Sequence, residues 1–520
     1  TLGPAPADGE DDRGERDMDP DARALWDATL AAPGGPLAGM RLIAARAEPG
    51  RIAYRVQAAD DELISLPHAR IARSLGIRDR ELVVCQHDGL ADGMVSVYEE
   101  HPLLTVREAT VADLTMDDQG RIALGVQHDG RPARIHLYKP ALGATTDLFV
   151  GAPGAGKSVA LNTLLIAERI SGVVSLVADA QDGMSLPECD GRVAHFGKGI
   201  AATGATLAAA YAVAKYRQQV SSANGWGSFA LNSPWPLVNL TLDELNLILS
   251  AEAEVSKDFK QWVIALIAAF QSTGRKMGVG IRFAAQSIHL ADLGDKAKLR
   301  ANAKTGSVWM GRTTSSTTQG MATDGVLPPH VELVPIPERF GGGTDVDAAY
   351  AGCEEAQGPT TAGMANLIQG GTVARMRVWR AEKIDRTYPH LIALYESAPM
   401  PLLTAEEQSV FDDAYARALA RAEQLLAADD GSGDDGFGEE IGDGLDHLLA
   451  SRPAAPAGPA PVADRILAVL AEHGPLPLRE IRRHLPDLAA GTVNNAAGEL
   501  AGTGALVRRG RGVYALPDHP

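Results

Sequence analysis

One short segment restricts the fold of this chain more than any other feature. The apolar run at residues 148–150 has the pattern of a buried strand, and the run at 159–170 has that of a helix. Between them lies Gly151-Ala152-Pro153-Gly154-Ala155-Gly156-Lys157-Ser158, which matches the pattern GxxxxGK[ST]. Glycines let a loop backbone wrap an anion with its N–H groups, and the helix N-terminus that follows favours negative charge. The segment therefore predicts a phosphate-binding loop in an alternating α/β fold.

The side chains of this loop indicate a nucleoside triphosphate as the ligand. Lys157 can reach the β- and γ-phosphates, and the hydroxyl of Ser158 can hold Mg²⁺. ATP and Mg²⁺ are therefore the expected cofactors. The residues predicted to bind the nucleotide are Gly151, Ala152, Pro153, Gly154, Ala155, Gly156, Lys157, Ser158 and Val159.

Polar residues follow two further predicted strands. The strand at 237–242 ends at Asp243-Glu244, and the strand at 280–285 ends at Gln286. An acidic pair after a strand is often only the charged start of a helix. In a chain with a phosphate-binding loop, however, Asp243 is expected to orient the Mg²⁺ shell and Glu244 to polarise the attacking water. Ligands of parallel sheets gather at the carboxyl ends of the strands, so Gln286 is predicted to sense the nucleotide.

Charge and cysteine usage restrict the environment of the chain. The net charge of −18 disfavours a nucleic-acid partner at first sight, but residues 402–452 alone carry thirteen acidic and three basic side chains. The remainder is only mildly acidic. The three cysteines form no CxxC pair, which argues against a zinc site or a disulfide framework and for a reducing, cytoplasmic location.

The sequence also bears on the membrane. No apolar run approaches the roughly 18–20 residues that a membrane span needs. Because the chain begins with Thr1 and not with Met, we expect an upstream segment. Such a segment leaves open an association with the inner face of the cell membrane.

Composition shifts divide the chain into five predicted regions. They are an acidic, disordered N-terminus (1–35), an α+β accessory domain (36–140), a P-loop ATPase domain (141–398), an acidic and Ala/Pro-rich linker (399–461) and a winged-helix DNA-binding domain (462–516).

The last region has the pattern of a winged helix-turn-helix. Helical patterns at 464–473, 478–484 and 491–500 precede a strand-turn-strand pattern at 505–516. In this layout the third helix enters the major groove and the wing flanks it. The residues predicted to contact DNA are Thr492, Asn494 and Asn495 at base edges, and Arg508, Arg509 and Arg511 at phosphates or the minor groove. The alternative is a winged helix that binds proteins or dimerises.

The motifs together resemble those of the FtsK/SpoIIIE family of DNA translocases, in particular its actinobacterial plasmid-transfer (Tra) branch. Residues 154–162 resemble the family's GSGKSxxxN loop, 242–244 its hhDE strand, 274–287 its GRxxGIHLxxATQRP segment and 299–302 its IKAN segment. The resemblance covers roughly residues 146–320. It implies a RecA-like P-loop core, ATP hydrolysis coupled to movement of double-stranded DNA, and a homo-oligomeric, hexameric ring.

The sequence departs from the family pattern at two places. AQSI replaces TQRP from residue 285, and Gly306 stands where the family has an arginine. If that arginine completes a neighbouring subunit's ATP site, its role passes to Arg300 or Arg312, or the site works without it. An arginine that is solvated or contacts phosphate is equally compatible. Residues 215–217 and 224–227 are candidates for DNA-contacting loops of the pore.

Three functions are consistent with these features. The first is a motor that moves plasmid or mobile-element DNA between cells, with the winged helix selecting the DNA loading site. The second is a related ATPase that moves proteins in secretion. The third is a DNA-binding regulator that uses ATP as a switch, against which the intact Asp243-Glu244 pair argues.

Overall fold

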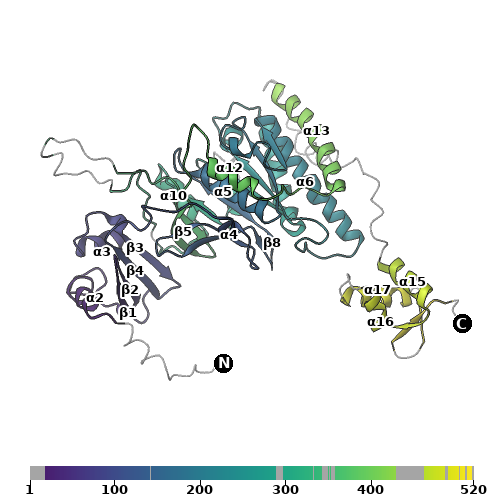
Figure 1. The fold of residues 1–520 in the computed structure, drawn as a ribbon, viewed down its shortest axis with the longest axis horizontal. Helices are drawn as coiled ribbons and strands as arrows, with labels where there is room; N and C mark the ends of the chain where they lie inside the picture. Colours follow the sequence, from purple (N-terminus) through teal and green to yellow (C-terminus); the bar gives the residue numbers. More distant parts are fainter. Residues whose placement is uncertain are drawn as a thin grey trace.

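The structure of the protein is a computed structural model that describes residues 18–140, 142–287, 297–331, 333–341, 350, 352, 358–428, 462–485, 490–502, 504–509 and 512–517. These residues form an N-terminal domain, a central α/β domain and a small C-terminal unit (Figure 1). None of the helices in these ranges is long and apolar enough to cross a membrane.

The N-terminal domain is built on a four-stranded antiparallel sheet with the order β1-β2-β4-β3. Trp26 packs on Tyr54 with ring centroids 5.5 Å apart, at the centre of an apolar cluster separate from the cores of the α/β domain. The elements are α2 (Pro20–Leu25), the π-helix η1 (Trp26–Leu30), β1 (Arg41–Glu48), β2 (Arg51–Gln57), α3 (His68–Ser74), η2 (Arg80–Leu82), β3 (Val83–Asp88) and β4 (Asp92–Tyr98).

The predicted disorder of residues 1–35 is wrong for the part that the structure describes. Asp19 caps α2 by accepting a hydrogen bond from the backbone N–H of Ala22 at 2.9 Å. Trp26 and Leu30, four residues apart and therefore on one helical face, are both buried. The acidic, Pro-rich composition around this short helix concealed it. Residues 1–17 lie outside the described residues.

A ten-stranded sheet forms the frame of the central domain. Its order is β11-β10-β12-β13-β9-β14-β15-β16-β5-β6. The first six strands are parallel, and every pairing from β14–β15 onward is antiparallel. The strands are β5 (Arg121–Gln127), β6 (Pro132–His136), β9 (Thr146–Val150), β10 (Val174–Asp179), β11 (His195–Lys198), β12 (Val238–Asp243), β13 (Val279–Ala285), β14 (Val308–Met310), β15 (Met364–Gln369) and β16 (Thr372–Val378).

The sheet corrects the predicted division at residue 140. Strands β5 and β6 fall within the predicted accessory domain, yet they extend the large sheet through the pairing of β5 with β16. Their partner lies some 250 residues away in the sequence, and local patterns do not reveal such pairings. A further two-stranded ribbon, β7 (Tyr138–Lys139) with β8 (Gly143–Ala144), leads from β6 to β9.

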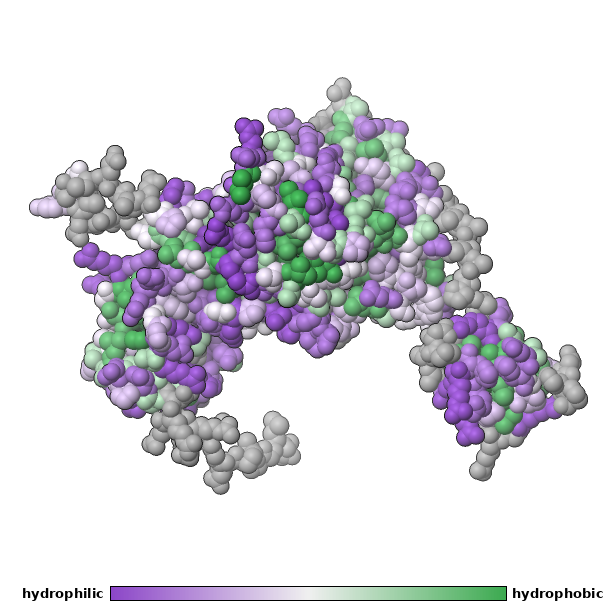
Figure 2. Space-filling model, in the orientation of Figure 1, coloured by the Kyte–Doolittle hydropathy of each residue, from purple (hydrophilic) through white to green (hydrophobic). Residues whose placement is uncertain are grey.

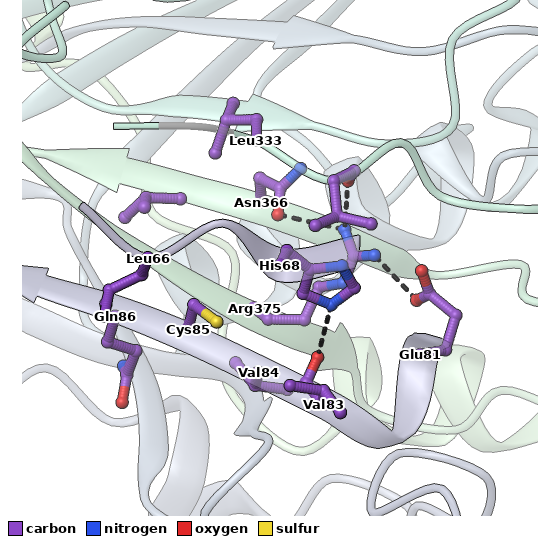
Figure 3. Close-up of a pocket in the computed structure, with 12 residues that line it drawn as sticks. Leu66, His68, Glu81, Val83, Val84, Cys85, Gln86, Leu333, Asn366 and Arg375 are labelled. Carbon is purple, nitrogen blue, oxygen red and sulfur yellow. Dashed lines mark hydrogen bonds and ion pairs between the residues drawn. The ribbon is translucent and has the colours of Figure 1, made fainter. Parts of the chain in front are cut away.

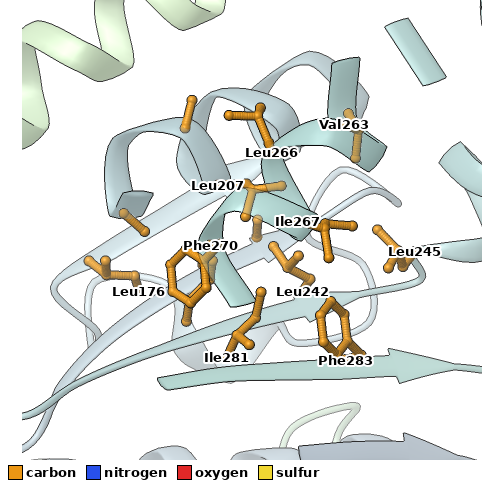
Figure 4. Packing of buried hydrophobic residues seen from close by; sticks show 14 of the residues in the cluster. Leu176, Leu207, Leu242, Leu245, Val263, Leu266, Ile267, Phe270, Ile281 and Phe283 are labelled. Atoms are coloured by element: carbon orange, nitrogen blue, oxygen red, sulfur yellow. The ribbon is translucent and has the colours of Figure 1, made fainter. Parts of the chain in front are cut away.

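Helices cover both faces of the parallel strands. On one face α6 (Ile200–Ala223) and α8 (Lys257–Thr273) pack on apolar side chains such as Leu242, Ile281 and Phe283 (Figure 4). The other face is covered by α5 (Lys157–Ile170) and α12 (Pro389–Glu396). The remaining short helices are α4 (Val111–Leu114), η3 (Pro187–Cys189), α7 (Asn246–Leu249), η4 (Gly274–Met277), α9 (Ala297–Ala303) and α10 (Ser316–Thr323).

Helix α13 (Ala405–Ala427) belongs to the central domain, although the linker was predicted to begin at residue 399. It packs along α6 and buries Phe411 and four further apolar side chains. The guanidinium of Arg217 on α6 donates to the carboxylate of Glu407 at 2.5 Å and to three backbone carbonyl oxygens, and both side chains are fully buried. Residues 429–461 lie outside the described residues.

A buried ion pair joins the N-terminal domain to the large sheet. Arg375 on β16 donates to the carboxylate of Glu81 in η2 at 2.7 Å, beside a small cavity of about 40 Å³ (Figure 3). Burial opposes ionisation of Glu81, but Arg375 and His101 outweigh it, so the pKa of Glu81 is lowered. The contact fixes the domain against the antiparallel half of the sheet.

The C-terminal unit contains the three predicted helices and a small sheet. A three-stranded sheet of order β17-β19-β18 closes an apolar cluster formed by Ile466, Ile481, Val493 and five others. Hydrophilic residues dominate the face of this unit that is visible in Figure 2. Its elements are α15 (Val462–His473), β17 (Leu476–Pro477), α16 (Leu478–His484), α17 (Ala490–Gly502), β18 (Val507–Arg508) and β19 (Val513–Ala515).

Candidate functional site

The glycine loop connects the carboxyl end of β9 to the start of α5. Gly154 and Gly156 have φ angles of 77° and 92°, a region that glycine adopts without strain. A Cβ atom on Gly156 would lie 2.3 Å from the backbone nitrogen of Gly363, which donates to the carbonyl oxygen of Ala155 at 2.9 Å. The indole of Trp309 lies beneath the loop near Gly151. Glycine is therefore required both for the turn and for close packing.

The lysine of the loop contacts both predicted carboxylates. Lys157 Nζ lies 2.7 Å from Asp243 Oδ1 and 2.6 Å from Glu244 Oε1, and all three residues are buried. The contact spans two strands, because β13 lies between β9 and β12 in the sheet. Lys157 thus meets two residues that follow it in the sequence by 86 and 87 positions.

Electrostatics couple these three side chains. Burial raises the pKa of Asp243 to about 6, although the ammonium of Lys157 opposes that shift. For Lys157, burial acts to lower the pKa, but Asp243 and Glu244 outweigh it and the pKa is raised. The lysine is therefore a permanent cation at neutral pH, available to a phosphate once it leaves the carboxylates.

Glu244 has an uncommon backbone conformation and a second side-chain partner. Its φ is 54°, in the left-handed region that non-glycine residues seldom adopt, and its N–H donates to Asp243 Oδ1 at 2.9 Å. Gln286, at the end of β13, donates from Nε2 to Glu244 Oε2 at 3.1 Å. The glutamate is thus held between Lys157 and Gln286. Strained conformations of this kind cluster at functional sites.

The residues of the site fit a magnesium nucleotide. The loop offers a glycine-lined cradle at the N-terminus of the 14-residue helix α5. Asp243 Oδ2 is buried and has no hydrogen-bond partner among the described residues, so it can accept from a water of a magnesium shell. Ser158, the predicted magnesium ligand, is half-buried in the first turn of α5.

The buried carboxylate of Asp179, at the same edge of the sheet, was not predicted from the sequence. Asp179 ends β10 in register with Asp243 and accepts hydrogen bonds from the N–H groups of Gln181 and Ser185. These two hydrogen bonds hold the loop after β10. The strand-end rule that selected Asp243 would have selected Asp179 as well.

The structure separates the two candidate arginines. Arg300 on α9 lines a cavity of about 560 Å³ together with Gly306 and the β15–β16 turn, at the amino-terminal edge of β14 and away from the glycine loop. Arg312 follows the carboxyl end of β14 and contacts the loop of its own chain. Packing explains why a glycine and not an arginine stands at position 306. A Cβ atom there would lie 2.4 Å from the carbonyl oxygen of Thr146.

One residue in each of the two candidate pore stretches makes a contact within the fold. Arg217 is fully buried in its ion pair with Glu407. Trp226 packs edge-on against the buried Trp235, with ring centroids 5.7 Å apart. Arg217 is therefore engaged within the fold, whereas the other residues of the two stretches stay candidates.

The predicted DNA-contacting residues of the C-terminal unit differ in their surroundings. Asn494 Oδ1 accepts from Arg482 Nε at 3.0 Å, so this oxygen is engaged within the unit. Thr492 is half-buried, and Asn495 is exposed. Of the wing arginines, Arg508 lies 5.4 Å from the centre of the Tyr514 ring, and Arg509 is exposed; Arg511 lies outside the described residues.

A glycine loop at the carboxyl edge of a parallel-rich sheet, between strand and helix, defines the central domain as a P-loop α/β domain. No family model matches the sequence, and no curated protein matches it.

Among solved structures, the chain is similar to the cytoplasmic domain of the type VII secretion ATPase EccC of Thermomonospora curvata (20% identity, TM-score 0.40). That match covers 56% of this chain and 33% of the solved EccC chain, so this chain spans about a third of the length of that structure. It is also similar to the pCW3 conjugation coupling protein TcpA with ATPγS (13%, TM-score 0.41, 71% of this chain and 95% of TcpA). The chain is similar as well to ATPases 2 and 3 of EssC from Geobacillus thermodenitrificans, with 13% identity and a TM-score of 0.40. That match covers 58% of this chain and 54% of the EssC chain.

Proposed function

We propose that the protein is an ATP-driven translocase of double-stranded DNA that works as a hexameric ring. Its cargo is plasmid or mobile-element DNA that passes between cells, as in the Tra branch of the FtsK/SpoIIIE family. The C-terminal unit is a winged helix that selects the DNA loading site.

The observation that carries the hydrolytic part is the contact of Lys157 with Asp243 and Glu244. A site that binds a nucleotide without hydrolysing it needs only the glycine loop and the lysine. The second carboxylate, held in a strained backbone conformation and oriented by Gln286, has no role in binding a triphosphate that already carries negative charge. We therefore assign it the role of general base for water.

Each residue of the site has a proposed task. The loop N–H groups and Lys157 would bind the phosphates, and Ser158 and Asp243 would hold the magnesium ion. A bound magnesium ion neutralises the charge that develops on the transferred phosphoryl group. When Lys157 turns to the phosphates, the carboxylate of Glu244 becomes available to the attacking water, while Gln286 keeps it oriented.

The DNA-reading role rests on the order of elements in the C-terminal unit. Three helices followed by a β-ribbon, with β17 completing the sheet, is the order of a winged helix. Of the predicted base-contacting residues, the exposed Asn495 on α17 is the best placed, since the oxygen of Asn494 is engaged by Arg482. From 462 to 516 the sequence carries seven Arg against five Asp and Glu, which suits a polyanion better than the acidic remainder does.

Deleting residues 453–520 is expected to abolish discrimination between DNA sequences and to leave DNA-stimulated ATPase activity in place. The reason is that the pump grips any duplex, whereas the tethered unit raises the local concentration of one sequence. The preferred duplex would be obtained by enrichment from a random library on the full chain. Competition binding against random duplex then compares the two proteins.

The matched point variant is Asn495→Ala in the full chain. Its affinity for the enriched duplex should fall by about 1–3 kcal/mol, with little change for random duplex. Full sequence discrimination by the truncated chain would refute the assignment and favour a protein-binding role for the C-terminal unit.

A protein-transporting ATPase is the second candidate. The secretion ATPases and the conjugation coupling protein named above correspond to the two kinds of cargo, and likenesses this distant do not choose between them. The winged-helix order of the C-terminal unit favours DNA.

A further inference from the structure

An arginine of the same chain forms hydrogen bonds with the loop that would hold the nucleotide. Arg312 Nη2 donates to the carbonyl oxygen of Pro153, at the tip of the glycine loop, at 2.9 Å. The backbone carbonyl oxygen of the same residue accepts from the N–H of Ala152 at 2.8 Å. One residue thus fixes the loop at two consecutive positions, once with its backbone and once with its side chain.

The strand order shows which side of the loop this arginine occupies. The sequence of neighbours β12-β13-β9-β14 places Asp243 and Glu244 two strands to one side of the loop strand, and Arg312 one strand to the other side. The β9–β14 pairing continues beyond Met310, because Gly311 N–H donates to Val150 O at 2.9 Å before Arg312 meets the loop. Arg312 therefore flanks the loop on the side away from the hydrolytic carboxylates.

A second segment, beside Arg312, also forms a hydrogen bond with the loop. Gly363, just before β15, donates to Ala155, and β15 is the antiparallel neighbour of β14. The end of β14 and the start of β15 thus hold Ala152, Pro153 and Ala155 from outside. Of these contacts, only the one from the Arg312 guanidinium is made by a side chain that a substitution can remove without disturbing the backbone.

We propose that Arg312 is a positioning residue that acts in cis: it holds the glycine loop of its own subunit in the nucleotide-receiving shape. The inference rests on the proposed nucleotide-binding function. Because the guanidinium binds the outer carbonyl of the loop, the inner N–H groups stay directed toward the phosphates. A loop ordered before binding loses less conformational entropy when the nucleotide arrives, which strengthens binding. This role replaces the trans-acting role that the sequence left open for Arg312.

The test compares Arg312→Met, Arg312→Lys and Arg300→Met in the full chain. Affinity for ADP and for ATPγS is measured by calorimetry in Mg²⁺ without DNA, and kcat and KM for ATP are measured separately. Arg312→Met should weaken binding of both nucleotides about tenfold, which corresponds to ~1.4 kcal/mol, and raise KM. The kcat at saturating ATP should stay within about twofold, because Arg312 lies away from Glu244. Arg312→Lys should recover part of the affinity through one charged hydrogen bond, and Arg300→Met should bind like the unchanged protein.

Protein concentration distinguishes action in cis from action in trans. A cis residue lowers affinity equally in dilute and concentrated protein, whereas a trans residue lowers it only where subunits associate. Unchanged affinity with a kcat loss of about 10³-fold or more is the signature of a trans-acting arginine and would overturn the proposal. So would a loss of affinity confined to concentrated protein. If the unchanged protein binds neither nucleotide, the proposed function fails together with this inference.

Discussion

Lys157→Ala is expected to abolish nucleotide binding, whereas Glu244→Gln is expected to keep binding and to lower kcat by at least about 10²-fold. Lys157 belongs to the glycine loop and is buried beside both carboxylates, so its loss removes the charge that is expected to meet the phosphates. Glutamine in place of Glu244 keeps the shape of the side chain but removes its capacity to accept a proton. The two variants therefore separate binding from hydrolysis. Calorimetry with ATPγS and a phosphate-release assay measure the two effects.

A matched control distinguishes a loss of nucleotide binding from a loss of folding. Lys157→Ala leaves the buried carboxylates of Asp243 and Glu244 without their cation, so its thermal unfolding must be recorded beside that of Lys157→Arg, which keeps the charge. Turnover by Glu244→Gln at the rate of the unchanged protein would eliminate Glu244 as the general base. The next candidate would then be Asp243, whose pKa is raised to about 6 by burial.

Arg217→Met is expected to destabilise the central domain by about 3–5 kcal/mol. The substitution leaves the fully buried carboxylate of Glu407 without its cation and removes three hydrogen bonds to backbone carbonyl oxygens. Helix α13 should detach from α6, since Glu407 is also the residue that closes the capping box of α13. Urea unfolding followed by circular dichroism measures the loss.

The double variant Arg217→Met/Glu407→Gln is the control for this ion pair. Removing both charges should restore a substantial part of the stability, because no unpaired charge remains buried. Equal stabilities of Arg217→Met and the unchanged protein would show that α13 is not anchored by this pair, and would return Arg217 to the pore candidates.

Local patterns in the sequence predicted the positions of the strand and helix around the glycine loop for a physical reason. Strand, glycine loop and helix are consecutive, so β9 (Thr146–Val150) and α5 (Lys157–Ile170) lie within a few residues of the predicted positions. The carboxyl ends of parallel strands meet at one edge of a sheet, which is why Asp243, Glu244 and Gln286 converge although their roles remain predictions.

Features that depend on distant partners were not predictable in this way. The pairing of β5 with β16 and the anchoring of α13 by Arg217 join segments about 190 to 250 residues apart. The contact from Arg482 to Asn494 depends on how α16 and α17 cross, which neither helix encodes alone. The position of Arg312 follows from strand order, since only the neighbour relation of β9 and β14 brings it to the glycine loop.

The most direct test of the proposed function is the rate of ATP hydrolysis by the full chain with and without long duplex DNA. A DNA translocase predicts a turnover that rises severalfold or more with duplex of any sequence, and that rises further with protein concentration as rings assemble. Glu244→Gln should show no such rise. A turnover that is substantial but indifferent to duplex DNA would contradict the DNA cargo and favour a protein substrate. Negligible turnover under both conditions, with ATP still bound, would instead indicate the ATP-switched DNA-binding regulator.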